Sequence, residues 1–436
     1  MLTKAVIAAL IVVAGFSGAA AAGRSLPAPD GEYAVGMRRF ELTDAKRHGV
    51  LSNDPKEVRI LPGYVWYPAN KSARGTRPYL TSAEAAIQGP SMARNFDYDE
   101  TELKGLDQII AHSVEDTPPA RGPAFPILIF SHGYECYPAQ NTALLERLAS
   151  HGYIVVSIAH PHDSADLQLS NGTVLKTEHP VARNPEYAAI RRTLAGGPNH
   201  DARTSVIKGY AEAFSKDSLG SSLAAWRDDT VFIARAIVER DVPANLMPVI
   251  KRGDVRRLGF IGMSFGGATS AATCRLVPQC RVVINLDGGN YDPALFNASV
   301  ERPMLLMMSD WVNLPLPGRP NDPSFHLNDY AYEPWLRAGL DPDVVRVRLE
   351  GIRHMGYTDL ILLMQGANHA AQFGTIAPDV AVETIGAASL AFLNQYLKGG
   401  DRGRLEAMLK SSSVLRLHSP ASVRDWSRER GMSQRP

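Results

Sequence analysis

The chain has 436 residues, of which 45% are hydrophobic and 21% are charged, with 36 Gly and 30 Pro. This balance is ordinary for a protein that buries a large core, and it excludes disordered, collagen-like and disulfide-scaffold chains. The 46 Lys and Arg residues and the 45 Asp and Glu residues nearly cancel, so the chain lacks the positive excess of a nucleic-acid-binding protein and we expect no nucleic-acid partner.

Residues 1–22 have the order of parts that is typical of a secretory signal peptide. Lys4 precedes an apolar run from Ala5 to Phe16, and small residues up to Ala22 follow. The apolar run holds about 12 residues, fewer than the roughly 20 that span a bilayer. We expect cleavage near Ala22 and a mature protein that is secreted or periplasmic, where disulfides are permitted.

The rest of the chain alternates short apolar runs with longer helical stretches. The runs predicted to form strands are Val58–Tyr67, Pro126–Phe130, Tyr153–Ala159, Arg257–Ile261, Val282–Leu286, Met304–Met308 and Val344–Leu349. Apolar residues spaced by three and four predict helices over Ala143–Ser150, Trp226–Val238, Phe265–Leu276 and Val380–Leu397. This alternation predicts an α/β fold with a mostly parallel sheet and helices on both of its faces.

Two stretches interrupt the alternation. Residues 168–222 are polar and rich in turn residues, which predicts an insertion over the sheet edge or the active site. The proline-rich residues 311–323 form either a loop at a pocket rim or a packed surface connection. We expect residues 23–436 to form one domain that carries the insertion.

Three cysteines, Cys136, Cys274 and Cys280, are too few for a disulfide framework or a cysteine zinc site. Cys274 and Cys280 lie between a predicted helix end and the next predicted strand. Their pairing would stabilise the fold by roughly 2 kcal/mol in the chain-entropy model, and two buried thiols are the alternative. We expect the bridge, with Cys136 as a buried free thiol.

The most informative segment is Gly262-Met263-Ser264-Phe265-Gly266, a G-x-S-x-G sequence between a predicted strand and a predicted helix. In this context a sharp turn lifts the serine hydroxyl above the sheet, and bulky side chains in place of the two glycines would clash. We therefore expect Ser264 to act as a nucleophile, which requires a nearby base and an acid that orients the base.

His354 is the predicted base because it follows the predicted strand Val344–Leu349, where a sheet of this kind presents its base. His369, further along the chain, is the alternative. Two aspartates at strand ends compete for the role of the acid. Asp287 follows the strand next after Ser264, whereas Asp310 follows the strand beyond it, in the commoner position, and spacing alone does not choose between them.

An oxyanion hole usually combines the backbone N–H after the nucleophile with a backbone N–H after an earlier strand. Phe265 supplies the first donor. Tyr134 is the candidate for the second, because it follows the strand Pro126–Phe130 and the small-residue turn Ser131-His132-Gly133. We expect His132 to brace this turn, and a role as a second base is the alternative.

A His160-Pro161-His162-Asp163 segment also follows a strand, and such an H-x-H pair can bind a divalent metal in hydrolases of another fold. No partner set at a recognisable spacing follows it. We interpret the segment as a structural turn and expect no metal or organic cofactor. A metal-dependent hydrolase and a non-catalytic binding module are the minor alternatives.

Several segments spread over residues 125–398 resemble one known family. They are Phe130-Ser131-His132-Gly133, Leu148–Val155 running on to His160 and Ser164-Ala165, Gly262–Gly267, Leu286-Asp287, Ile352-Arg353-His354 and Ala388–Leu393. The family is that of the secreted platelet-activating-factor acetylhydrolases, the lipoprotein-associated phospholipase A2 branch of the α/β-hydrolases. The last segment is not catalytic, which makes it good evidence of kinship. The resemblance implies an α/β-hydrolase fold with Asp287 as the acid.

The resemblance also implies a secreted serine esterase of lipid degradation that removes a short sn-2 acyl group from a phospholipid through an acyl-enzyme. The chain departs from the family at Gly288-Gly289, in place of bulky apolar residues, and at Tyr134-Glu135-Cys136, in place of a smaller turn. A broad-specificity carboxylesterase or polyester hydrolase with the same triad is therefore the alternative. Apolar loops at Trp311–Leu316 or Leu360–Leu363 either touch a membrane or lipid surface or pack in the core.

Overall fold

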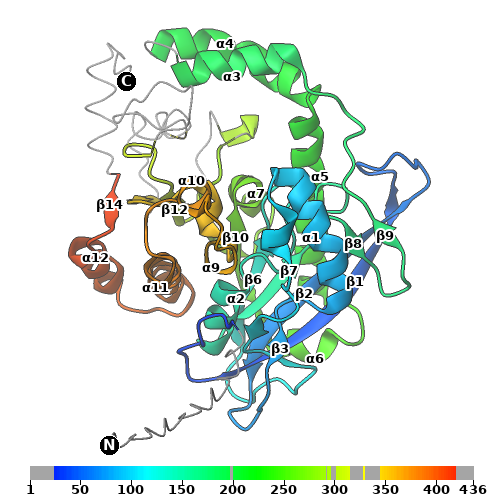
Figure 1. Cartoon of the computed structure of the whole chain (residues 1–436), viewed down its shortest axis with the longest axis vertical. Coiled ribbons are helices and arrows are strands. Elements are labelled where there is room, and N and C mark those ends of the chain that lie inside the picture. The colour runs from blue at the N-terminus through cyan, green and yellow to red at the C-terminus, as the bar shows by residue number, and fades with distance from the viewer. Residues whose placement is uncertain are drawn as a thin grey trace, which may run out of the picture.

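A computed structural model describes residues 24–196, 200–290, 292–295, 301–314, 328 and 344–418. Its centre is a 10-stranded sheet in the order β14-β13-β12-β11-β10-β6-β7-β2-β1-β5 (Figure 1). The strands are β1 (Ala34–His48), β2 (Val58–Ala69), β5 (Val114–Glu115), β6 (Phe125–Ser131), β7 (Ile154–Ile158), β10 (Gly253–Met263), β11 (Cys280–Leu286), β12 (Met304–Met308), β13 (Val344–Leu349) and β14 (Leu415–Leu417). Two short ribbons pair β3 (Arg77–Pro78) with β4 (Ile110–Ala111) and β8 (Leu167–Gln168) with β9 (Val174–Leu175).

The strands from β7 to β13 in this order run parallel, and β14, β2 and β1 add antiparallel pairs at the two sides. The parallel strands consist of nearly continuous apolar runs such as Ile127–Phe130, because both faces of such a sheet are covered. The mostly parallel sheet that the sequence predicts is confirmed.

Helices cover both faces of the sheet. The described residues contain α1 (Ser82–Phe96), α2 (Thr142–Ser150), α3 (Pro185–Gly196), α4 (His200–Ser215), α5 (Ser218–Glu239), α6 (Met247–Ile250), α7 (Phe265–Cys274), α9 (Leu360–Leu363), α10 (His369–Phe373), α11 (Pro378–Leu397) and α12 (Arg402–Ser411), with 3-10 turns η1 (Glu100–Leu103), η2 (Pro293–Leu295) and η3 (His354–Tyr357). Of these helices, α3 and α4 lie apart from the sheet. Alternate strand residues divide between two cores. Leu128 and Ile261 face the core that includes α2 and α11, whereas Ile129 and Phe260 face the core that includes α5 and α7.

The seven predicted strands and four predicted helices are present. Met304–Met308 and Val344–Leu349 have the predicted bounds, and the other elements have one or both ends shifted, whereas β1 and α1 were not predicted. β1 lies near the edge of the sheet, and charged residues such as Arg38, Arg39 and Glu41 interrupt its apolar alternation. α1 contains Pro90, which ordinarily argues against a helix interior, and a capping box at Thr81 and Glu84 marks its start.

The predicted insertion, residues 168–222, contains β9, α3, α4 and the start of α5. In Figure 1, α3 and α4 lie together at the top of the molecule. Their apolar side chains form a separate cluster that includes Tyr210, Trp226 and Phe265. The insertion therefore packs against Phe265, the residue that follows Ser264. The division into a leader and one domain stays a prediction, and residues 1–22 lie outside the described residues.

Cys274 at the end of α7 forms a disulfide with Cys280 at the start of β11, as predicted, and Cys136 is buried and free. Of the two apolar loops, Leu360–Leu363 belongs largely to the core, because Leu360, Ile361 and Leu363 are at most 3% exposed. Most of the proline-rich loop, from residue 315 on, lies outside the described residues.

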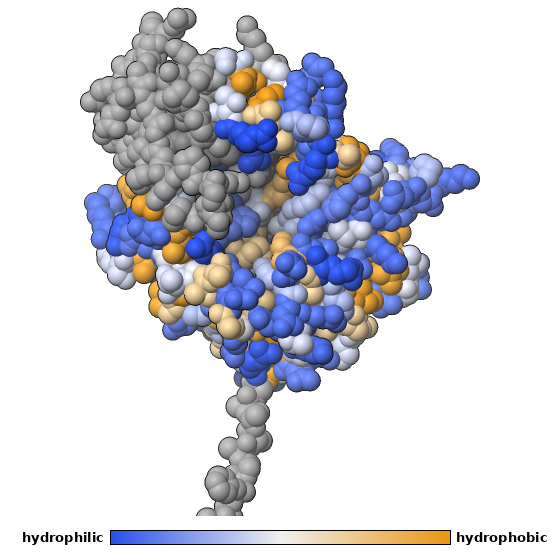
Figure 2. Space-filling model, turned by 45° about the horizontal axis from the view of Figure 1, so that its top comes forward, coloured by the Kyte–Doolittle hydropathy of each residue, from blue (hydrophilic) through white to orange (hydrophobic). Residues whose placement is uncertain are grey.

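The face seen in Figure 2 is largely hydrophilic, with apolar side chains in small separate groups. The exposed large apolar side chains of the described residues, Val174, Leu276, Val380 and Leu417, come from four different parts of the fold. No helix within the described residues is long and apolar enough to span a membrane.

Candidate active site

Ser264 occupies a strained turn between β10 and α7. Its φ of 55° and ψ of −119° lie in a region that a residue with a side chain rarely adopts, and its amide donates a hydrogen bond of 2.8 Å to Leu286 O. A Cβ at Gly262 would overlap the main chain of Gly266, and a Cβ at Gly266 would overlap the carbonyl of Ser131. The two glycines are therefore required sterically, and Ser264 stands at the carboxyl end of β10.

A chain of two hydrogen bonds joins Ser264, His354 and Asp287. His354 Nε2 lies 2.8 Å from Ser264 Oγ, and His354 Nδ1 lies 2.6 Å from Asp287 Oδ2. A carboxylate can only accept a hydrogen bond, so Nδ1–H donates to Asp287 and Nε2 is left to accept the Ser264 hydroxyl proton. The side chain of His354 is 44% exposed and that of Asp287 only 7%, so water reaches the imidazole but scarcely the carboxylate.

Main-chain contacts hold Asp287 in place. Its φ is 57°, its amide donates to Met307 O at 2.7 Å, and its Oδ1 accepts a 2.6 Å hydrogen bond from the amide of Ser309. A Cβ at the next residue, Gly288, would overlap the carbonyl of Ser264. Gly288 thus allows the Asp287 turn to approach the Ser264 turn closely.

Asp310, the alternative acid, makes different contacts. It forms an ion pair with Arg348, accepts a 2.7 Å hydrogen bond from the amide of Gly351, and its own amide donates to Ile352 O at 2.9 Å. Burial raises the pKa of Asp310, but the hydrogen bonds from Gly351 and Asn313 and the bond from Arg348 outweigh it and lower the pKa below its usual value. Asp310 therefore holds the connection from β13 to His354 rather than the imidazole itself.

The two predicted oxyanion donors lie in neighbouring segments, the start of α7 and the loop after β6. Phe265 is the first residue of α7, and Tyr134 lies in the loop after β6, where a Cβ at Gly133 would be 3.5 Å from Ser264 Cβ. The backbone amides of Gly133, Glu135 and Cys136 each donate a hydrogen bond, whereas the amide of Tyr134 has no partner within the described part of the chain. The amide of Tyr134 is therefore available to a ligand next to Ser264.

Three aromatic rings pack against one another at these two donors. The ring of Tyr134 meets that of Phe265 edge to face at 5.5 Å, and Trp226 of α5 meets Phe265 in the same way at 5.0 Å. The backbone of Tyr134 and Phe265 was predicted from the sequence, but Trp226 was not predicted as a neighbour of the site because it lies in a helix that is distant in sequence. Trp226 is 0% and Phe265 is 3% exposed, so these two rings pack behind the donors and support them.

The other candidate histidines lie apart from the chain around Ser264. His132 is fully buried and donates from Nδ1 to Gly133 O at 2.6 Å, and burial lowers its pKa to about 3, so it is neutral and braces the turn. His369 Nε2 is 2.9 Å from Ile361 O, on the side of α10. Among the described residues, neither side chain is hydrogen-bonded to Ser264.

His160 and His162 do not converge on a common point. His160 bonds to Asp229 at 2.9 Å and to Ser131 at 3.2 Å, whereas His162 bonds to Glu57 at 2.7 Å. Across the described ranges, no group of three or more His, Cys, Asp or Glu side chains is placed to hold a metal ion. The His160 segment thus forms a hydrogen-bonded turn.

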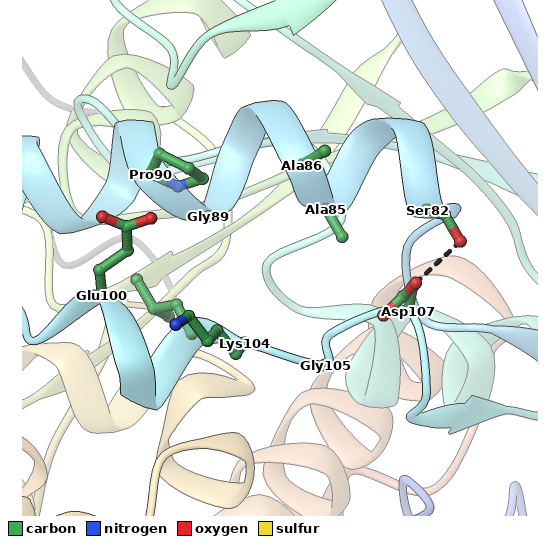
Figure 3. A pocket seen from close by; sticks show the side chains of 10 residues that line it. Ser82, Ala85, Ala86, Gly89, Pro90, Glu100, Lys104, Gly105 and Asp107 are labelled. Atoms are coloured by element: carbon green, nitrogen blue, oxygen red, sulfur yellow. Dashed lines mark hydrogen bonds between the residues drawn. The ribbon is translucent and has the colours of Figure 1, made fainter.

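A separate cavity of about 360 Å³ lies between α1 and η1 (Figure 3). Ser82 closes one side of it with a 2.8 Å hydrogen bond to Asp107. Its lining residues are Ser82, Ala85, Ala86, Gly89, Pro90, Glu100, Leu103, Lys104, Gly105 and Asp107. None of them belongs to the chain around Ser264, so this cavity is distinct from the candidate active site.

Comparison with known proteins identifies the family of the chain. Residues 23–315 match the family model described as platelet-activating factor acetylhydrolase, isoform II. A platelet-activating factor acetylhydrolase of Gallus gallus is 22% identical over 395 residues, which cover 87% of this chain and 86% of the relative. A probable 1-alkyl-2-acetylglycerophosphocholine esterase of Arthroderma benhamiae is 24% identical over 435 residues, which cover 91% of this chain and 92% of the relative.

Among solved structures, a ferulic acid esterase from Streptomyces cinnamoneus superposes with a TM-score of 0.61 at 21% sequence identity, covering 91% of this chain and 100% of that chain. At this identity the likeness shows the fold, which is that of the α/β-hydrolases. The family match spans more than half of the chain and confirms the resemblance seen in the sequence. The chain therefore belongs to the platelet-activating factor acetylhydrolase, isoform II, family and is a carboxylic ester hydrolase.

Proposed function

We propose that this protein is a secreted serine esterase that hydrolyses short-chain acyl esters, including the short sn-2 acyl ester of a phospholipid, through an acyl-enzyme. The observation that carries the proposal is the hydrogen-bonded chain from Ser264 through His354 to Asp287. The names of the relatives supply the substrate class, since one is a probable 1-alkyl-2-acetylglycerophosphocholine esterase.

In the first half of the reaction, Ser264 Oγ attacks the ester carbonyl carbon while His354 Nε2 takes the hydroxyl proton. Asp287 stays ionised and stabilises the imidazolium that forms. The amides of Tyr134 and Phe265 donate to the oxyanion of the tetrahedral intermediate. The intermediate collapses when the bond to the leaving oxygen breaks, and His354 returns its proton to that oxygen as the alcohol departs.

In the second half, water replaces the alcohol. The neutral imidazole of His354 takes a proton from this water, whose oxygen attacks the acyl carbon, and the second tetrahedral intermediate expels Ser264 with the proton from His354. The partial exposure of the His354 side chain gives water access to this step. One carboxylic acid and one alcohol leave for each ester and water consumed.

The proposal includes export, with residues 1–22 removed as a signal peptide. The disulfide between Cys274 and Cys280 supports it, because disulfides persist in oxidising compartments. We expect the exported protein to begin at Gly23 when its N-terminus is sequenced. A mature protein that retains Met1 would contradict cleavage.

Replacement of the nucleophile tests the mechanism. We expect a fluorophosphonate to titrate one site per wild-type molecule and Ser264→Ala to lose this labelling, with ester turnover lower by about 10⁴-fold to 10⁶-fold. Ser270→Ala is the control, since Ser270 is a buried serine of the adjoining helix α7 whose hydroxyl donates to Gly266 O at 2.7 Å. A folded Ser264→Ala protein with near wild-type turnover would show that the mechanism is wrong.

Substrate profiling of the titrated enzyme separates the two ester classes. We expect kcat/KM to be highest for phospholipids with an sn-2 acetyl group and to fall with acyl length. Equal or faster hydrolysis of aryl esters or polyesters would assign the protein instead to the broad-specificity carboxylesterases.

The two aspartates should respond differently to amide substitution. Asp287→Asn can no longer hold the imidazole in its working tautomer, so kcat should fall by about 10⁴-fold in a folded protein. Asp310→Asn breaks the ion pair with Arg348, so it should lower the free energy of unfolding by roughly 3 kcal/mol while kcat falls by less than about 10-fold. Steady-state kinetics and urea unfolding measure both effects, and the opposite ranking of the two kcat losses would make Asp310 the acid.

A further inference from the structure

A second Ser–His–Asp chain lies behind the loop that carries Tyr134. Ser131 Oγ is 3.2 Å from His160 Nε2, and His160 Nδ1 is 2.9 Å from Asp229 Oδ2. The three residues come from the end of β6, the turn after β7 and the middle of α5. Each is at most 2% exposed, so this chain cannot meet a substrate and its purpose is not hydrolysis.

Two arginines keep Asp229 charged. Arg59 donates two hydrogen bonds to its carboxylate, at 2.6 and 3.1 Å, and Arg47 forms a further ion pair with it. Burial raises the pKa of Asp229, but the charge of Arg59 and the hydrogen bond from His160 outweigh burial and hold the pKa well below its usual value. An ionised Asp229 accepts a hydrogen bond from Nδ1–H of His160, so Nε2 carries no proton and accepts a hydrogen bond from the hydroxyl of Ser131.

Burial lowers the pKa of His160, so the imidazole is neutral and keeps this one tautomer. Its ring stacks on Trp226 with centroids 3.9 Å apart and planes 12° apart. Trp226 Nε1 donates to Asp163 Oδ2 at 2.8 Å, and the carbonyl of Asp163 accepts the amide of Glu135 at 2.7 Å. His160 is thus linked to both ends of the loop from Ser131 to Glu135.

Hydrogen bonds to the carbonyl of Gly133 hold the middle of this loop in place. Gly133 O accepts hydrogen bonds from His132 Nδ1 at 2.6 Å and from the amide of Cys136 at 3.0 Å. Nε2 of His132 in turn faces the main-chain amide of His160 at 3.2 Å. A trans peptide is planar, so the carbonyl of Gly133 and the N–H of Tyr134 point in opposite directions. The bonds that hold the carbonyl therefore aim the Tyr134 N–H.

The nucleophile turn packs on the same loop. Ser131 pairs with Gly262 in the register of β6 and β10, and the close approach of Gly266 brings α7 against the carbonyl of Ser131. A displacement of Ser131 or of the loop behind it would therefore change the position of the Tyr134 amide relative to Ser264.

We propose that the buried chain of Ser131, His160 and Asp229 is a positioning network that aims the Tyr134 amide at the oxyanion. This inference rests on the proposed function, because it takes Tyr134 as an oxyanion donor. A misdirected donor stabilises the transition state less but does not change the binding of the substrate. Disruption of the network therefore lowers kcat and leaves KM unchanged.

The test uses Ser131→Ala, which removes one hydroxyl, and His160→Phe, which keeps an aromatic ring on Trp226 but loses both ring hydrogen bonds. For each variant the fluorophosphonate titre gives the active fraction, and kcat per titrated site, KM, the phosphonylation rate constant and the Ki of a non-hydrolysable ether analogue of the substrate are measured. A purely structural defect lowers the titre, whereas a positioning defect lowers the rates per site.

We expect Ser131→Ala to lower kcat and the phosphonylation rate per site by about 10-fold, and His160→Phe by 10-fold to 100-fold, with KM and Ki within twofold of wild type. Ser157→Ala is the matched control, because Ser157 is a buried serine of the adjacent β7 whose hydroxyl bonds to Pro138 O at 2.7 Å, and it should keep the wild-type rates.

The outcomes separate the two proposals. If the wild-type protein is not phosphonylated at Ser264, the proposed function fails. If the wild-type protein is phosphonylated but Ser131→Ala reacts within twofold of its rate per site, the positioning network is wrong. A rise in KM or Ki at unchanged kcat would also overturn it, since the network would then serve substrate binding. Ser131→Ala is the milder change, so it decides the matter even if His160→Phe fails to fold.

Discussion

The active-site geometry depends on main-chain segments that approach one another with no side chain between them. A Cβ at Gly262, Gly266 or Gly288 would each overlap a main-chain atom of a neighbouring turn. These absences let the turn at Ser264 adopt a positive φ and bring the Asp287 turn against it. Gly288 is thus part of the packing at Ser264.

The charged groups around this turn are divided between two tasks. Asp287 uses one carboxylate oxygen for the amide of Ser309 and the other for His354. Asp310 directs its carboxylate to Arg348 and to the amide of Gly351, and so holds the segment from which His354 projects. Each carboxylate is hydrogen-bonded to backbone amides and to either a cation or a ring N–H. These partners offset the cost of burying the negative charge. One aspartate orients the imidazole and the other orients its backbone.

The sequence predicted the parts of this arrangement that depend on local pattern. The buried parallel strands are continuous apolar runs, and the G-x-S-x-G turn between β10 and α7 marks Ser264. Proximity in space was harder to predict. Spacing alone left Asp287 and Asp310 open, and only the resemblance favoured Asp287, because both aspartates follow strands that end at the same edge of the sheet.

The contacts of Asp229 show the same limit more strongly. Its carboxylate meets Arg59, which is 170 residues away in sequence, and His160, which is 69 residues away. No local pattern records such pairings. β1 was missed for a different reason, since its partial exposure mixes charged residues into the apolar alternation that marks a strand.

The central claim is that the Ser264 turn and the loop after β6 together present a nucleophile and two backbone donors to one reacting centre. A crystal structure of the phosphonylated protein tests this claim most directly. The account predicts phosphorus bonded to Ser264 Oγ, with the phosphoryl oxygen about 2.7–3.1 Å from the amides of both Tyr134 and Phe265. A covalent bond to any other residue, or a phosphoryl oxygen that points away from both amides, would contradict it.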